Sequence, residues 1–415
     1  MTDEIKAIYD QKIKRVNDAI ELKEPDRVPV APCANSLPYF LSEDTVFQDS
    51  MYNYDKAVDA IVKYYSHYDQ DAIMYIGLTS GKANELAGTS QIDWPGRPGS
   101  IVAPTSSHQV IEHEFMTPEE YPELLRDYTG FMMKKYIPRA FTNLTGLKSF
   151  NLNPATILNA SFLSGIYNPD VLSAFKLLEQ IGGYDAEAAA ASAAVNERLG
   201  EMGMPPFMTG ISEAPFDILS DYFRGTIGAM EDQLEYPDYV AAACDMFADQ
   251  QIEQLAWMKD ADLPVKRIFF PLHKAMDGFM GPDDFQEIYW KPLKKIMLAL
   301  IDMDVTPYIY TEGRYDTRLE AMTDIPKGKV IYHFETADMK RAKQILGDVA
   351  CISGNLPIYL LEYGTKEQVA DYVKYLIDNC AGGGGYIFDT NAGIDNAKRE
   401  NVDIMFETAY TYGKK

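Results

Sequence analysis

Five short apolar runs in the second half of the chain each stop at a polar or ionisable residue. Each run is bounded by Gly, Pro, Asp or Lys and is followed by a stretch with helical periodicity, which is the spacing of repeated βα units in a parallel sheet. The runs carry His273, Glu312, His333 with Glu335, Asn355, and Asp389. Because parallel strands end at one edge, we expect these side chains to lie on one face of the fold.

Three earlier apolar runs raise the number of candidate strands to eight. The eight are expected at residues 27–35, 72–79, 206–215, 265–273, 305–313, 330–336, 349–357 and 386–394. Eight such strands with helices between them predict an α/β fold, a (β/α)8 TIM barrel whose chemistry lies at the carboxyl ends of the strands.

The pattern also predicts how the chain is divided. We expect residues 1–24 to form an N-terminal helical extension that Pro25 ends. Residues 25–415 are expected to form one barrel domain, with a long insertion at about residues 80–205 between strands two and three. Such an insertion is typical of a lid, a substrate wall or a partner surface. A decoration that covers an edge is the alternative.

Composition restricts the function and the compartment. The formal net charge of −24 argues against nucleic acid as a partner, because phosphate binding requires clustered Lys and Arg. No apolar run of membrane-spanning length and no signal sequence is present, so a soluble cytoplasmic protein that is not bound to a membrane is expected. The four cysteines are widely spaced without a CxxC pair, which indicates thiols rather than a disulfide framework or a four-thiolate zinc site.

Several segments resemble the uroporphyrinogen decarboxylase superfamily. The resemblance is carried by EPDRVPV near the N-terminus, SEAPFD followed by Arg224 and Gly225, LHKAMDGFMGPDDFQEIYWKPL, TEGRYDTRLE, GNLP, and GGGGYIFDTNAGIDNAKREN. It implies a (β/α)8 barrel and an enzyme that acts as a decarboxylase, as a corrinoid-protein-to-thiol methyltransferase, or as the methyltransferase that removes methyl groups from methyl ethers.

Departures from the family patterns separate these three activities. The decarboxylase carries arginines after its first strand, and the corresponding stretch APCANSLPYF has no basic residue. The thiol-directed members of the family share two zinc-binding cysteines. By the resemblance, Glu335 and Ala392 stand at those two positions in this chain. The remaining pair is Glu312 and His333, with twenty residues between them, and it resembles the metal pattern of the ether-demethylating members. Met297 stands where that pattern has a further Glu.

The resemblance and the strand ends together suggest a zinc site and a substrate site. Zinc is expected on Glu312 and His333, with His273 or Glu335 as the third ligand and an open position for a departing oxygen. His273, Glu335 and Asp389 are the candidate catalytic residues, and the candidate substrate-binding residues are Asn35, Glu213, Tyr310, Asn355 and Asn391. Each has a structural alternative: His273 can bridge a strand end, and Asp217, Asp221 and Arg224 can form a helix-capping ion-pair cluster.

The resulting hypothesis is a methyltransferase that takes the methyl group of a methoxylated, aromatic compound and passes it to cob(I)alamin. The chain lacks the DxHxxG string with which corrinoid-carrying proteins ligate cobalt, so the corrinoid is expected on a separate partner protein. A homodimer is compatible with the sequence. A non-catalytic ligand-binding barrel is the alternative from outside the enzymes.

Overall fold

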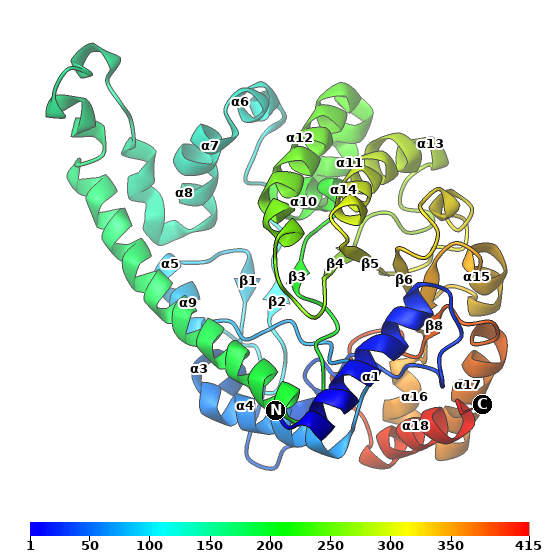
Figure 1. Cartoon of the computed structure of the whole chain (residues 1–415). Helices are drawn as coiled ribbons and strands as arrows, with labels where there is room; N and C mark the ends of the chain where they lie inside the picture. Colours follow the sequence, from blue (N-terminus) through cyan, green and yellow to red (C-terminus); the bar gives the residue numbers. More distant parts are fainter. Residues whose placement is uncertain (415) are drawn as a thin grey trace.

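Six strands form one parallel sheet at the centre of the molecule. The computed structural model describes residues 1–414, and within them the strand order is β3-β4-β5-β6-β7-β8 (Figure 1). These strands are Gly210–Ile211, Arg267–Leu272, Thr306–Thr311, Ile331–Phe334, Cys351–Ser353 and Tyr386–Ile387. Parallel neighbours require helical crossovers, which gives the α/β class that the sequence predicts.

Two further segments close this sheet into a barrel. The Ala31 amide donates to the Phe388 carbonyl at 3.0 Å, the Asp71 amide to Val30 at 2.9 Å, and the Phe207 amide to Ile73 at 2.8 Å. The first two expected strands, residues 27–35 and 72–79, are therefore in place but pair through isolated bridges rather than ladders. Prolines at positions 29, 32, 205 and 206 lack the amide hydrogen that a continuous ladder needs.

Helices surround the barrel. In chain order those of the N-terminal half are α1 Asp3–Ile20, α2 Leu37–Phe40, α3 Asp49–Tyr52, α4 Tyr54–His67, α5 Gly81–Ala87, α6 Tyr121–Arg126, α7 Tyr128–Phe131, α8 Ile137–Ala140 and α9 Pro169–Glu201. Those of the C-terminal half are α10 Pro215–Ile218, α11 Gly225–Glu235, α12 Pro237–Leu255, α13 Pro282–Asp284, α14 Lys291–Asp302, α15 Met339–Leu346, α16 Ile358–Tyr363, α17 Lys366–Cys380 and α18 Arg399–Tyr412. None within residues 1–414 combines the length and the apolar character needed to cross a lipid bilayer.

The alternation of side chains along the strands divides the core in two. One cluster fills the barrel interior and includes Phe269, Tyr308, Tyr310 and Ile331. The larger cluster lies between the strands and the surrounding helices and includes their sequence neighbours, such as Phe270 and Ile309. Residues 269, 308 and 331 are interior, so residues two positions further along each strand also point inward.

Helix α1 covers the amino-terminal end of the barrel. Its residues Val16, Ala19 and Ile20 pack with the interior cluster. Arg15 donates to Asp71 at 2.6 Å and to Asp26 at 2.6 Å, and the Val30 amide donates to Asp71 at 2.8 Å. The EPDRVPV segment thus joins the N-terminal helix to the first barrel position.

The residues between the second and third barrel positions, expected as an insertion at about 80–205, pack beside the barrel and share its outer core cluster through Tyr121, Phe131 and Val195. They include a two-stranded antiparallel sheet, β1 (Ile92–Asp93) with β2 (Gln109–Val110), and helices α6 to α9. Figure 1 shows α9 as a long diagonal helix that flanks this side of the molecule. The division into an extension, a domain and an insertion remains a prediction.

Candidate active site

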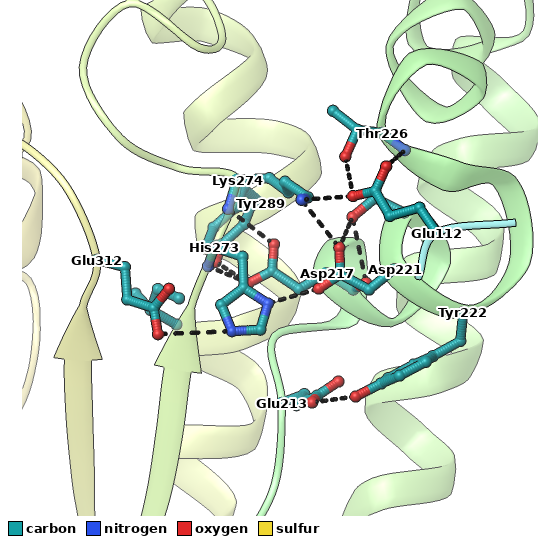
Figure 2. A network of polar contacts seen from close by, with 12 residues as sticks. Glu112, Glu213, Asp217, Asp221, Tyr222, Thr226, His273, Lys274, Tyr289 and Glu312 are labelled. Carbon is teal, nitrogen blue, oxygen red and sulfur yellow. Dashed lines mark hydrogen bonds and ion pairs between the residues drawn. The ribbon is translucent and has the colours of Figure 1, made fainter. Parts of the chain in front are cut away.

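Polar side chains gather where strands β3 to β6 end. Glu213, His273, Glu312 and Glu335 each follow the last or nearly the last residue of their strand. Figure 2 shows His273 between Asp221 on one side and Glu312 on the other. The 3.7 Å between His273 and Glu312 agrees with the expectation that these strand-end residues lie on one face.

His273 is held by carboxylates on both of its ring nitrogens. Its Nδ1 lies 2.5 Å from an oxygen of Asp221, and its Nε2 lies 3.7 Å from an oxygen of Glu312. Partial burial lowers the pKa of His273, but the hydrogen bond to Asp221 and the charges of Asp217 and Glu312 outweigh burial and raise the pKa to about 9. The ring therefore carries a proton at neutral pH. Because Asp221 occupies Nδ1, the Nε2 hydrogen is the one directed toward Glu312.

Asp217 fixes the backbone beneath this histidine. The amides of His273 and Lys274 donate to its two oxygens at 2.8 and 3.1 Å, and the Tyr289 hydroxyl donates at 2.5 Å. The side chain is completely buried. Burial raises the pKa of Asp217 to about 7 despite the neighbouring His273 charge. Asp217 is thus a positioning residue, because its hydrogen bonds come from two backbone amides and from Tyr289 rather than from the open end of the barrel.

Lys274 connects the strand end to the insertion. Its Nζ lies 3.1 Å from Asp221 and 3.3 Å from Glu112. Glu112 comes from the insertion and also accepts from the Thr226 amide at 3.2 Å. Burial acts against the charge of Lys274, but Asp221 and Glu112 raise its pKa overall. The insertion therefore supplies one carboxylate to the network at the barrel end (Figure 2).

Two further carboxylates at the barrel end have raised pKa values. Burial is the main cause for Glu213, whose Oε1 accepts from the Tyr222 hydroxyl at 2.5 Å. Its Oε2 has no hydrogen-bond partner among residues 1–414. Burial also raises the pKa of Glu312, with Glu335 and Asp221 adding to the effect. Both groups therefore accept a proton at a higher pH than an ordinary glutamate does.

His333 lies one layer deeper in the barrel than Glu312. The strand register pairs it with Tyr310, and the two rings stack with centroids 4.1 Å apart. Its Nε2 donates to the Thr390 carbonyl at 2.8 Å and lies 3.3 Å from Asp389. Both His333 and Asp389 are buried, and Asp389 accepts from the Cys33 amide at 3.0 Å. They form a second polar group inside the barrel.

This placement corrects the predicted zinc site. Glu312 is two residues further along its strand than the partner of His333, a displacement of roughly 6.6 Å along the strands. His273 and Glu312 approach each other, whereas the ring of His333 is stacked and hydrogen-bonded elsewhere. No group of three His, Cys, Asp or Glu side chains within residues 1–414 is arranged to hold a metal ion. The expected set of Glu312, His333 and His273 does not fit zinc in this arrangement.

The other predicted residues lie in three different settings. Tyr310 borders the interior and donates through its hydroxyl to the Asn391 carbonyl at 3.2 Å. Asn355 and Asn391 hydrogen-bond the backbone of neighbouring segments. Asn355 donates to the Ala337 carbonyl at 3.0 Å, and Asn391 accepts from the Ile358 amide at 2.9 Å. Asn35 is exposed and donates to Asp395 at 2.5 Å. Their contact with a substrate remains a prediction.

Several residues of the network were not selected from the sequence as site residues. Asp217 and Asp221 were assigned to a capping cluster with Arg224, but only Arg224 has that structural role, through Asp232 at 2.5 Å. Asp217 and Asp221 instead bind the His273–Lys274 segment. Lys274 directly follows His273 at the end of an apolar run, and this position could have indicated a site residue from the sequence. Glu112 lies in the insertion and offered no signal.

Comparisons with known proteins agree with this architecture. The family model described as Uroporphyrinogen decarboxylase (URO-D) matches residues 172–412. A uroporphyrinogen decarboxylase of Geobacter sulfurreducens is 27% identical over 180 residues, which are 43% of this chain and 51% of that protein. A uroporphyrinogen decarboxylase of Geobacter metallireducens is 26% identical over the same shares. The chain thus matches about half the length of these curated relatives.

A solved structure resembles nearly the whole chain. A methyltransferase from Methanosarcina mazei superposes with a TM-score of 0.59 and 15% sequence identity, covering 97% of this chain and 98% of that one. At this identity the likeness concerns the fold alone. It extends to the residues before 172, which the family model does not match.

Proposed function

Since the chain belongs to the uroporphyrinogen decarboxylase family, we propose that it is a methyltransferase of this superfamily and the ether-cleaving component of a corrinoid-dependent O-demethylase. Its substrate would be a methoxylated, aromatic compound, and its methyl acceptor would be cob(I)alamin on a partner protein. The observation that supports this proposal is the placement of His273 between Asp221 and Glu312 at the carboxyl ends of the strands.

The alkoxide or phenoxide that departs from a methyl ether is a poor leaving group unless its oxygen is protonated. As the carbon–oxygen bond breaks, its electron pair stays on oxygen, and the electron pair of cobalt(I) forms the new bond to the methyl carbon. The departing phenoxide takes the Nε2 proton of His273. Phenol and His273 have pKa values of about 10 and about 9, a match that favours general acid catalysis.

The surrounding residues prepare His273 for this step. Asp221 holds the ring at Nδ1 and keeps its proton on at neutral pH, while Asp217 fixes the backbone that carries it. Glu312, 3.7 Å from Nε2, is placed to receive a proton from solvent and return it to His273 after transfer. Tyr222, which is exposed at the barrel end, offers aromatic surface for a flat substrate.

The decarboxylase activity of the curated relatives is the main competing function. A substrate with several carboxylates requires cationic partners. The network described above contains the carboxylates Glu112, Glu213, Asp221, Glu312 and Glu335, and its cations Lys274 and His273 are already paired. On the first strand's side, Asn35 is bound to the acidic Asp395. These contacts favour a neutral or electron-rich ether over a polycarboxylate.

A three-component assay tests the proposal. Mixing the chain with a cob(I)alamin-loaded partner protein and a methoxyarene should produce the absorption spectrum of methylcobalamin and one equivalent of phenol. H273Q should retain binding of the methoxyarene and lower turnover by about 100-fold or more, as expected when a general acid is removed. Phenol formed without corrinoid would refute the proposal, as would decarboxylation of a tetrapyrrole substrate.

A further inference from the structure

Arg267, the first residue of β4, is a buried cation without a carboxylate partner. Five Lys or Arg side chains are buried in the part of the chain that the structure describes, and they are Lys12, Arg15, Arg224, Arg267 and Arg318. The other four each form an ion pair with an Asp side chain. A buried charge is costly unless an opposite charge compensates it. Within residues 1–414 Arg267 has no such counter-charge.

The groups that bind the Arg267 guanidinium are neutral. Its Nη1 donates to the Phe207 carbonyl at 3.0 Å, and its Nη2 donates to the Asn17 side chain at 2.6 Å. Its Cζ lies 5.5 Å from the centroid of the Phe207 ring. A guanidinium has five N–H donors, so further donors remain for another acceptor. Burial lowers the pKa of Arg267 to about 10, which still leaves the side chain charged at neutral pH.

Arg267 lines a cavity at the amino-terminal ends of β4 and β5. The cavity has a volume of about 270 Å³ and is bordered by Asn17 and Ile20 of α1 and by Thr306, the first residue of β5. One water molecule needs only about 10–15 Å³ by the same measure, so the cavity has room for a small anion. It lies at the end of the barrel opposite His273, which follows the carboxyl end of β4.

The other charged side chains around this cavity leave its positive charge uncompensated. Lys266 lines the cavity, is half-buried and forms no ion pair within the described residues. Lys329 also lines it and lies 3.9 Å from Asp304, which is 94% exposed to solvent. The remaining carboxylate, that of Glu21, is bound to Lys23. The cavity therefore has three cations along its wall and no buried carboxylate.

We propose that this cavity binds a small oxyanion, a phosphate or a carboxylate group, which accepts hydrogen bonds from the Arg267 guanidinium and pairs with Lys266 and Lys329. Guanidinium and ammonium groups are the side chains that recognise these anions in proteins. The anion supplies the counter-charge that the chain lacks at this position. Because Arg267 is hydrogen-bonded to Asn17, a bound anion connects α1 with β4 and stabilises this end of the barrel. The site is separate from the proposed methyl transfer.

Binding of inorganic phosphate, sulfate and succinate to the purified chain tests this site. In a chloride buffer free of oxyanions and at constant ionic strength, calorimetry should show saturable binding of one anion per chain. The melting temperature should rise by about 2–4 °C at roughly 100 times the dissociation constant. Binding of phosphate or sulfate identifies a tetrahedral ligand, and binding of succinate alone identifies a carboxylate.

Two variants of the cavity and one control complete the test. Arg267→Met keeps a side chain of similar length without its charge and should weaken anion binding at least about 100-fold. Lys266→Gln with Lys329→Gln changes partly exposed positions, so the fold is retained, and should weaken binding about three- to tenfold. Lys340→Gln, exposed on α15, should bind as the wild type does. Absence of saturable binding for all three anions overturns the proposal, and so does an affinity that either cavity variant leaves unchanged.

Discussion

Replacement of Asp221 by Asn should lower the pKa of His273. The variant keeps the size of the side chain and an oxygen that accepts from Nδ1, but it removes the charge that lies 2.5 Å from the ring. An opposite charge at this distance shifts a pKa by about one to three units. The His273 pKa of about 9 should therefore fall to roughly 6–8.

The change has a calculable effect on the protonated fraction. At pH 8 a histidine with a pKa of about 9 is roughly 90% protonated, and one with a pKa of about 7 is roughly 10% protonated. If His273 acts as the general acid, D221N should be about tenfold less active than wild type at pH 8 and nearly equal to it at pH 6. The folded protein binds this proton more tightly than the unfolded chain, whose pKa is about 6.5. Its contribution to stability is thus complete below pH about 6.5 and is lost as the pH rises to about 9.

Two measurements check this reasoning. The ring-proton chemical shifts of His273, assigned by comparison with H273Q among the five histidines of the chain, give the pKa directly in wild type and D221N. Glu112→Gln is the control, because Glu112 contacts Lys274 rather than His273, and it should leave the His273 pKa within a few tenths of a unit. An unchanged or higher His273 pKa in D221N would refute the assignment of Asp221 as the group that keeps the ring protonated.

Three further substitutions test the structure around the site. Tyr289→Phe removes the hydroxyl donor to buried Asp217 and should lower the free energy of unfolding by about 1.5–3 kcal/mol in urea denaturation, whereas Tyr412→Phe at an exposed hydrogen bond should change it by less than about 0.5 kcal/mol. Arg224→Gln breaks a buried ion pair with Asp232 and should cost about 3–5 kcal/mol, against no more than about 1 kcal/mol for the exposed Arg341→Gln. His333→Gln should leave the metal content of the protein unchanged by elemental analysis, and a stoichiometric loss of zinc would show that His333 is a ligand after all.

The barrel was predictable because its physical signal is local. Strands β4, β5 and β6 lie inside the expected residues 265–273, 305–313 and 330–336, where long apolar runs end at a polar residue. The first barrel position was predicted as a regular strand, but prolines 29 and 32 interrupt its hydrogen bonding. The position was therefore recognisable from its apolar residues, whereas the loss of regular pairing follows from the two prolines within it.

The depth of each site residue along the barrel axis was less predictable than whether its side chain points into the barrel. His333 and Glu335 both point inward, as the two-residue period requires. Which of them reaches the barrel end depends on the register between β5 and β6, which pairs Tyr310 with His333. A single sequence contains no information on that register. The spacing between Glu312 and His333 therefore suggested a shared metal ion where the structure gives two separate groups.

The position of His273 depends on two carboxylates four residues apart. Asp217, in α10, binds the amides of residues 273 and 274, and Asp221, in the next helical turn, binds the ring of His273 and Nζ of Lys274. One short helical segment therefore holds both the backbone and the side chains of the strand end. This explains why the SEAPFD and LHK segments, more than fifty residues apart in the sequence, act as one structural unit. A shift of this helical segment would move the proton of His273 away from the departing oxygen, so substitutions that loosen its packing should reduce turnover even where they contact no substrate.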